Sequence, residues 1–149
     1  MNRSEKALLY FNNSFNCSQS VLTAFAPDLG ISEDESLKIA CAFGAGMGRM
    51  QHTCGAVTGA LMAIGLQHGK ALNDDESKKQ HTYALTREFC EAFLKKNGSL
   101  NCRELLLGLD MNDPDDNLKI KELDLHDTHC SRFVEDAVEI IEKILVDNE

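Results

Sequence analysis

The sequence lacks three features that would fix its class at once. Its six cysteines include no Cys-x-x-Cys pair, which excludes a thioredoxin-like active site and a zinc ribbon. Its longest apolar run lies within residues 56–66, far short of the roughly 20 residues that cross a bilayer. Its basic side chains form no cluster, and its formal net charge is −9. These absences predict no membrane insertion and argue against a nucleic-acid partner.

The first residues of the chain carry no pattern typical of export. Residues 1–11 contain an arginine, but no apolar run followed by a small-residue cleavage site. The expected location is therefore the cytoplasm. Cysteines in that compartment serve more often as packing residues, metal ligands or redox-active thiols than as static disulfides.

The pattern of apolar residues indicates an all-α chain. No segment alternates apolar and polar residues as a strand would, and no internal repeat is present. The 149 residues are expected to form a single helical domain, residues 1–149, with about five to seven helices. Residues 110–127 are expected to be a loop or a short helix. Six residues are predicted to cap helix starts: Ser4, Asn16, Ser32, Thr53, Asn101 and Thr128.

A glycine-rich turn stands near the middle of the sequence. Gly44, Gly46 and Gly48 follow a predicted helix and permit positive φ values and close approach of another group. The turn lacks the Gly-Lys-Ser/Thr ending of a phosphate-binding loop. These three glycines are candidate cofactor-binding positions.

The helix after this turn is predicted to run from Cys54 to about His68. Thr53 is its expected N-cap, which places Cys54 in the first turn. One face of the helix is small and includes Gly55 and Gly59. A compact prosthetic group could approach the backbone there, so both glycines are also candidate cofactor-binding positions. The alternative is close packing against another helix.

The predicted helices divide the six cysteines into two groups. Four lie in the first turn of a predicted helix: Cys17, Cys54, Cys102 and Cys130. Cys41 and Cys90 lie in helix interiors and are predicted to be buried packing residues. A helix N-terminus stabilises a thiolate by only about 0.3–1 kcal/mol. Since one pKa unit corresponds to about 1.36 kcal/mol, this lowers the pKa of a cysteine by less than one unit. Convergent helix ends, a metal ion or a protonated histidine would have to supply the rest.

Several segments around the four helix-start cysteines form a set. One is the run Cys54-Gly55-Ala56-Val57-Thr58-Gly59, and the others are Asn16-Cys17, Asn101-Cys102 and a last Cys130 before the C-terminal helix. This set resembles the C_GCAxxG_C_C family of redox-active bacterial proteins, with Ala45 where similar proteins often have a glycine. The resemblance implies that these four cysteines form the redox site. It also implies an iron–sulfur cluster or a similar prosthetic group as a candidate cofactor.

We therefore predict a redox or metal-binding protein with four cysteines as catalytic or metal-ligating residues: Cys17, Cys54, Cys102 and Cys130. Dithiol–disulfide exchange and metal or iron–sulfur ligation both remain open. His52, His126 and His129 rank below the cysteines as ligands. The implied partner is a redox protein or a small prosthetic group, and a homodimer is an open option. The rival hypothesis is a helical structural or protein-interaction module whose sulfurs only fill the core.

The shared-site hypothesis makes one geometric prediction. Cys54 is the only one of the four cysteines that directly follows the glycine turn. It should therefore lie close to at least one of the other three and close to that turn.

Overall fold

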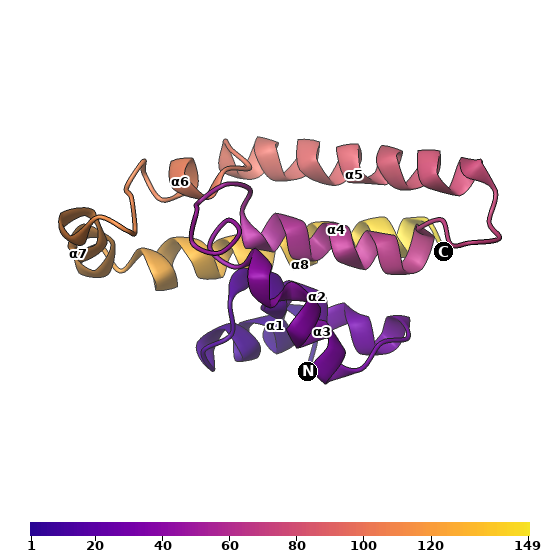
Figure 1. Ribbon diagram of the computed structural model, residues 1–149, viewed down its shortest axis with the longest axis horizontal. Coiled ribbons are helices and arrows are strands. Elements are labelled where there is room, and N and C mark those ends of the chain that lie inside the picture. Colours follow the sequence, from indigo (N-terminus) through magenta and orange to yellow (C-terminus); the bar gives the residue numbers. More distant parts are fainter.

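Helices joined by short turns and loops make up the protein, which a computed structural model describes over residues 1–149 (Figure 1). The α-helices in chain order are α1 (Arg3–Asn12), α2 (Cys17–Phe25), α3 (Glu33–Ala40), α4 (Gly55–His68), α5 (Glu76–Asn97), α6 (Cys102–Leu105), α7 (Pro114–Glu122) and α8 (Ser131–Asp147). Two 3-10 turns, Ala26–Leu29 and Cys41–Phe43, follow α2 and α3, and a π-helical turn, His126–Cys130, precedes α8.

The all-α prediction is confirmed, but the count of eight helices exceeds the expected five to seven. The additional helix is α7, which lies in the segment 110–127 that was predicted to be either a loop or a short helix. Asp113 caps α7 by accepting a hydrogen bond from Asp116 N, and Pro114 occupies the first helical position. Both residue types favour a helix start. The aspartate side chain accepts a hydrogen bond from a free backbone N–H group, and proline has no backbone N–H group that would need a partner.

Helix α4 lies at the centre of the fold. It is apolar on all sides, so it needs packing partners around its whole circumference. It packs against α2, α5 and α8. In Figure 1, α5 lies on one side of α4 and α8, while α1, α2 and α3 lie on the other side, and α6 and α7 lie at one end. None of the helices combines the length and the apolar character needed to span a membrane.

Three of the predicted caps are confirmed. Asn16 and Ser32 each form a capping box. The side chain of the cap accepts a hydrogen bond from the backbone N–H of the third helical residue, whose side chain accepts one from the backbone N–H of the cap. The Asn101 side chain accepts from Arg103 N and Glu104 N at the start of α6. The first helix begins slightly earlier than predicted, because Asn2 rather than Ser4 caps it.

The predicted caps of the other two cysteine-bearing helices are wrong. Cys54 itself is the N-cap residue of α4, one position after Thr53. Thr128 caps nothing, because its hydroxyl donates to the carbonyl oxygen of Asp124 inside a continuous helical segment. Cys130 therefore ends the π-helical turn and is followed directly by α8, so it lacks the free N–H groups of a helix start.

Cys41 also departs from its prediction. The regular helix α3 ends at Ala40, and Cys41 begins a 3-10 turn, so the α-helical spacing that predicted its burial does not extend to it. Cys41 is consequently exposed, whereas Cys90 is partly buried and packs against the core as predicted.

The small face of α4 packs directly on α2. A Cβ atom at Gly59 would lie 2.7 Å from the carbonyl oxygen of Ser18, and one at Gly55 would lie 3.0 Å from the backbone nitrogen of Ser18. These backbone atoms cannot rotate away as a side chain could. Close helix packing is therefore a role of both glycines.

Gly59→Ala is expected to lower the free energy of unfolding by about 1–2 kcal/mol, because the overpacking of about 1–3 kcal/mol outweighs the helix propensity gain of up to about 1 kcal/mol. Urea unfolding followed by circular dichroism measures the change. Gly65→Ala is the matched control, since Gly65 lies in the same helix and its added Cβ would meet nothing within 4 Å. It should stabilise the protein. Equal effects of the two substitutions would contradict the packing role.

Candidate functional site

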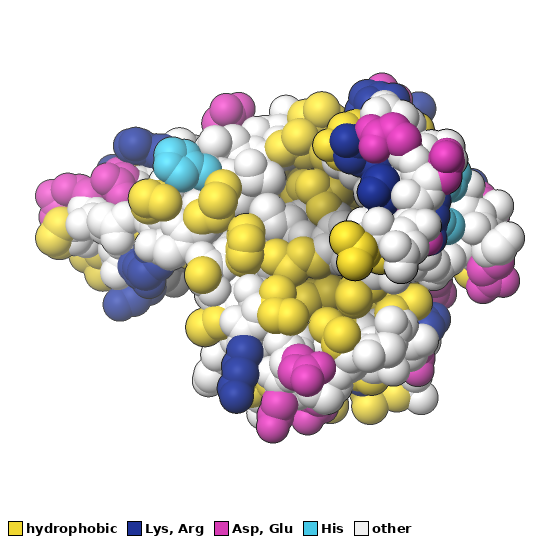
Figure 2. Space-filling view, turned by 45° about the vertical axis from the view of Figure 1, so that its right-hand side comes forward, with side chains coloured by type: hydrophobic (Ala, Val, Ile, Leu, Met, Phe, Trp, Pro, Cys, Tyr) yellow, Lys and Arg dark blue, Asp and Glu magenta, His cyan; other side chains and the backbone are white.

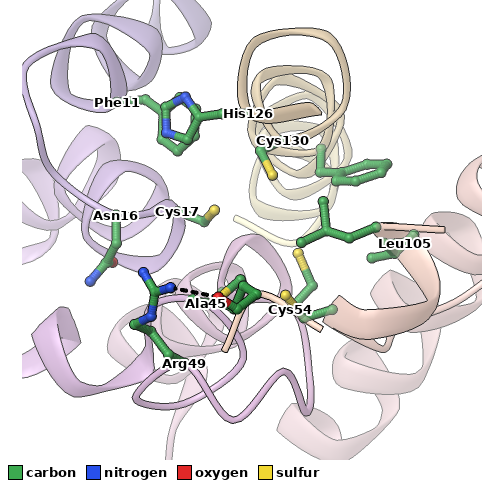
Figure 3. A pocket seen from close by; sticks show the side chains of 14 residues that line it. Phe11, Asn16, Cys17, Ala45, Arg49, Cys54, Leu105, His126 and Cys130 are labelled. Carbon is green, nitrogen blue, oxygen red and sulfur yellow. Dashed lines mark hydrogen bonds between the residues drawn. The ribbon is translucent and has the colours of Figure 1, made fainter. Parts of the chain in front are cut away.

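Four cysteines line one cavity of about 180 Å³. They come from four separate places in the chain: Cys17 starts α2, Cys54 precedes α4, Cys102 starts α6, and Cys130 ends the π-helical turn. The rest of the wall is mostly apolar and includes Leu105 and Phe133. Figure 3 shows Cys17 and Cys130 pointing into the space between these elements, with Cys54 below them.

Backbone pairing brings Cys54 and Cys102 together. Thr53 and Asn101 form an isolated antiparallel bridge. Cys54 N donates to the carbonyl oxygen of Leu100 at 2.8 Å, and Cys102 N donates to that of His52 at 2.6 Å. Side chains alternate in direction along such a pair, so Cys54 and Cys102 both project from the face opposite Thr53 and Asn101. The bridge therefore sets both sulfurs on the cavity side.

Cys17 begins α2 and Cys130 directly precedes α8, and both helices pack against α1. The Asn16 cap fixes the start of α2, and its side-chain amide also donates to the carbonyl oxygen of Cys41 at 3.0 Å. Cys130 follows four residues of π-helical turn, a local irregularity that is frequent at functional sites. Both cysteines are partly buried, whereas Cys54 is 4% and Cys102 8% exposed.

The glycine turn adopts a left-handed conformation over five consecutive residues. Ala45, Gly46, Met47, Gly48 and Arg49 all have φ between 53° and 69°. Non-glycine residues in this conformation cost roughly 1–2 kcal/mol each, and such strain collects at functional sites. Ala45 and Arg49 line the cavity, so the strained segment forms part of its wall.

A buried amide ties this turn to the loop after α6. Gln51 is 4% exposed. Its side chain accepts from Met111 N at 2.8 Å and donates to the carbonyl oxygen of Leu109 at 2.9 Å. The Arg49 guanidinium adds a bond to the carbonyl oxygen of Met111 at 3.2 Å. These contacts hold one wall of the cavity closed.

The two partly buried cysteines differ in acidity. Interaction with the Cys17 thiol, which can donate a hydrogen bond to the Cys130 sulfur, lowers the pKa of Cys130, although burial and Asp127 act in the opposite direction. The same interaction, together with burial, raises the pKa of Cys17 well above its usual range. Of this pair, Cys130 is therefore the thiol that ionises first.

Burial dominates the acidity of the inner cysteines. It raises the pKa of Cys54 to about 12, against the opposing effect of the backbone N–H groups of Ala56 and Val57. It also raises the pKa of Cys102 to about 12, and charge on Cys54 or Cys130 adds to this effect. Both inner cysteines are therefore neutral thiols near pH 7.

The candidate glycines lie in different surroundings. Gly55 lines the cavity, whereas Gly59 faces Ser18 on α2. Gly46 and Gly48 supply positive φ values as expected, but the φ of Gly44 is −67°. Gly44 instead leaves room for Asn16, whose side-chain atoms would lie 2.2–2.6 Å from an added Cβ.

Of the three histidines considered as ligands, only one lines the cavity. His126 lines the cavity and stacks on Phe11, with ring centroids 4.3 Å apart and planes 12° apart. His52 and His129, the other two histidines considered as ligands, are not among the lining residues. The sequence did not indicate the apolar wall residues or Gln51, because each depends on contacts between segments far apart in the chain.

Four cysteines are the ligands that usually hold an iron–sulfur cluster, so the cavity cysteines match such a cluster in type and number. No three of the His, Cys, Asp or Glu side chains are placed to hold a single metal ion. The residues available to hold a cluster are those that line the cavity: Cys17, Cys54, Cys102 and Cys130.

Comparison with known proteins adds to this geometry. The family model described as "Putative redox-active protein (C_GCAxxG_C_C)" matches residues 15–144. A protein of Archaeoglobus fulgidus, described as uncharacterized, is 30% identical over 151 residues, covering 94% of this chain and 93% of its own. No solved structure matches the chain. The family match covers most of the residues and includes all four cavity cysteines, so the chain belongs to the C_GCAxxG_C_C family.

Proposed function

We propose that this protein exchanges thiols and disulfides with a redox partner through the four cysteines of the cavity. The observation that carries this proposal is their convergence: four separate elements each direct one cysteine into a single, mostly apolar space. Packing alone would not require four sulfurs to share one cavity. The family description as redox-active supports the same reading.

The cysteines divide into an outer pair and an inner pair. The outer pair, Cys17 and Cys130, is partly buried, and its two sulfurs interact. The inner pair, Cys54 and Cys102, is nearly fully buried and is placed by the Thr53–Asn101 bridge. The outer pair is accessible to a partner, whereas the inner pair is accessible mainly to the outer one.

The outer pair carries the exchange in two steps. The Cys130 thiolate attacks one sulfur of a partner disulfide, which breaks that disulfide and releases the other sulfur as a thiolate. Cys17 then gives its proton to the released thiolate and attacks the Cys130 sulfur. This forms the Cys17–Cys130 disulfide and expels the second partner thiolate, which takes a proton from water. Two electrons have moved from the protein to the partner.

The inner pair extends this capacity. The Cys54 and Cys102 thiols can reduce the Cys17–Cys130 disulfide by the same two exchanges, which leaves a Cys54–Cys102 disulfide and restores the outer thiols. Their raised pKa values slow the exchange at neutral pH, because the thiolate is the attacking species. The inner pair would therefore act as a slower electron store.

Iron–sulfur ligation is a second candidate, favoured by the number and chemistry of the cavity donors. A bound cluster would supply one-electron transfer. The four cysteines would hold it, and the apolar wall would limit its contact with water. Iron and sulfide content after anaerobic purification distinguishes this candidate from thiol–disulfide exchange.

We expect the first intramolecular disulfide of the reduced protein to join Cys17 and Cys130. These two thiols are more exposed than the inner pair, and their interaction lowers the pKa of Cys130. Limited anaerobic oxidation by 2-hydroxyethyl disulfide, acid quenching and peptide mass spectrometry identify the bond. The background should carry Cys41→Ser and Cys90→Ser, since Cys41 is exposed and would react independently. Slow, unselective reaction of four ordinary thiols, with no bound metal, would instead support a structural or protein-interaction role.

A further inference from the structure

A second hollow adjoins the cysteine cavity. It measures about 410 Å³ and is lined mainly by polar residues, among them Asn12, Ser14, Asn16 and Asp127. We call it the polar groove. Its lining contrasts with the cysteine cavity, where 10 of 14 residues are hydrophobic. A ligand with polar ends and a reactive centre could therefore contact both spaces.

The two spaces share a wall made of Phe11, Asn16 and His126. Phe11 is 3% exposed and fixed in the core, whereas the side chain of His126 is 61% exposed. The His126 ring lies flat on Phe11 (Figure 3), and its one polar contact is with Asp127 at 3.3 Å. Rotation of this exposed ring would join the groove to the space in front of Cys17 and Cys130.

The polar groove carries a charge of one sign. Asp127 lines it, and no lysine or arginine does. Asp124 lies close enough to Asp127 for the Asp127 charge to contribute to the raised pKa of Asp124, behind the larger effect of desolvation. Arg49 lines the adjoining cysteine cavity instead, and its guanidinium donates a hydrogen bond to the carbonyl oxygen of Met111. A positively charged ligand end is therefore favoured in the groove over a carboxylate.

We propose that the polar groove binds small disulfides that carry a positively charged amine, and presents their sulfurs to Cys130 past the His126 ring. This assignment rests on the proposed thiol–disulfide exchange and names the substrate class of that site. The ammonium end lies beside Asp127, the amide and hydroxyl groups of the groove contact the polar chain, and the disulfide extends into the apolar cavity.

The test compares three small disulfides that differ in charge. Cystamine is cationic, 2-hydroxyethyl disulfide is neutral, and 3,3′-dithiodipropionate is anionic. The rate at which each oxidises the reduced Cys41→Ser/Cys90→Ser protein is divided by its rate with the uncharged thiol N-acetylcysteine amide, which removes differences in intrinsic reactivity. The normalised rate is expected to be highest for cystamine and lowest for the anionic disulfide, and the difference should shrink as salt is added.

Asp127→Asn should reduce the ratio of the cationic to the anionic normalised rate by about three- to fivefold, the effect of one nearby charge in a largely aqueous setting. The ratio is the proper readout, because Asp127 also raises the pKa of Cys130 and its removal would change all three rates together. Glu88→Gln is the matched control, since it removes the same charge from an exposed position on α5.

The outcomes separate the two levels of the proposal. Equal normalised rates for the three disulfides, or an Asp127→Asn effect no larger than that of Glu88→Gln, would overturn the substrate class while leaving the exchange chemistry intact. A protein whose Cys17 and Cys130 are oxidised by none of the three disulfides would overturn the proposed function itself, and the groove assignment with it.

Discussion

Cys130→Ser is expected to slow the formation of the first mixed disulfide with a small disulfide by at least about 50-fold at pH 7. Cys130 is the only cavity cysteine whose pKa lies below its usual value. The pKa values of Cys54 and Cys102 are raised to about 12. That of Cys17 is raised by its interaction with Cys130 and by burial, and the effect of burial persists in the variant. The variant therefore loses the cavity thiol that ionises most readily.

The size of the effect follows from the thiolate fractions. At pH 7, a thiol with an ordinary pKa of about 8.5 is about 3% ionised, and one with a pKa of about 12 is ionised in about one molecule in 10⁵. The thiolate with the higher pKa is the stronger nucleophile. With a Brønsted coefficient of 0.4–0.5, it attacks about 25 to 60 times faster per thiolate, which partly offsets its smaller thiolate fraction. A difference of about 50- to 120-fold remains, and burial of the inner thiols increases it.

Cys17→Ser is the matched control. A serine hydroxyl can still donate a hydrogen bond to the Cys130 thiolate, so the first step should continue and the mixed disulfide on Cys130 should accumulate. Cys17→Ala removes the donor as well, and should raise the pH at which Cys130 becomes reactive. Stopped-flow kinetics with mass spectrometry, in the Cys41→Ser/Cys90→Ser background, measures both steps. A Cys130→Ser variant that reacts as fast as Cys17→Ser would show that another cysteine is the nucleophile.

The sequence predicts the fold class and three of the six named helix caps correctly, because these depend on neighbouring residues. Asn16 and Ser32 form capping boxes with residues three positions later, and Asn101 caps α6 through the next two N–H groups. The predicted helix after the glycine turn is also present, with its start displaced by one residue. These features need no knowledge of the tertiary structure.

The selection of the four cysteines rested on a rule that holds for only three of them. Cys17, Cys54 and Cys102 lie at helix starts, but Cys130 lies at the end of a π-helical turn. A π-helical turn has no clear sequence signature, and Thr128 has the appearance of a cap. The residues that the family model matches include Cys130 all the same. The acidity of this cysteine depends on contact with α2 rather than on a helix end.

The walls of the cavity could not be predicted, because they depend on pairs of distant segments. Gln51 bonds to residues about 60 positions later, at Leu109 and Met111. Phe11 meets His126 across most of the chain. The sequence shows a glycine-rich turn, but not that Ala45, Met47 and Arg49 share its left-handed conformation.

Gly46→Ala should have the largest effect on folding, lowering the free energy of unfolding by about 3 kcal/mol. Gly46 has a φ of 68°, and a Cβ there would lie 2.5 Å from His52 N and 2.6 Å from the Gln51 backbone. The left-handed conformation costs roughly 1–2 kcal/mol for a residue with a Cβ, and overpacking adds about 1–3 kcal/mol. A loss of this size is a large share of the 5–15 kcal/mol typical of a folded domain.

Gly48→Ala separates the two contributions, because Gly48 has a similar φ of 57° but an added Cβ would meet nothing within 4 Å. It should cost about 1 kcal/mol or less, since the backbone penalty is partly offset by the lower entropy of the unfolded chain.

The reactivity of Cys102 supplies a second readout. The carbonyl oxygens of His52 and Gln51 accept backbone hydrogen bonds from Cys102 and Arg103, so moving them should expose Cys102. Alkylation of Cys102 should therefore be faster in Gly46→Ala than in Gly48→Ala under native conditions. If the two variants match in both stability and alkylation rate, the glycine turn does not position the inner cysteines.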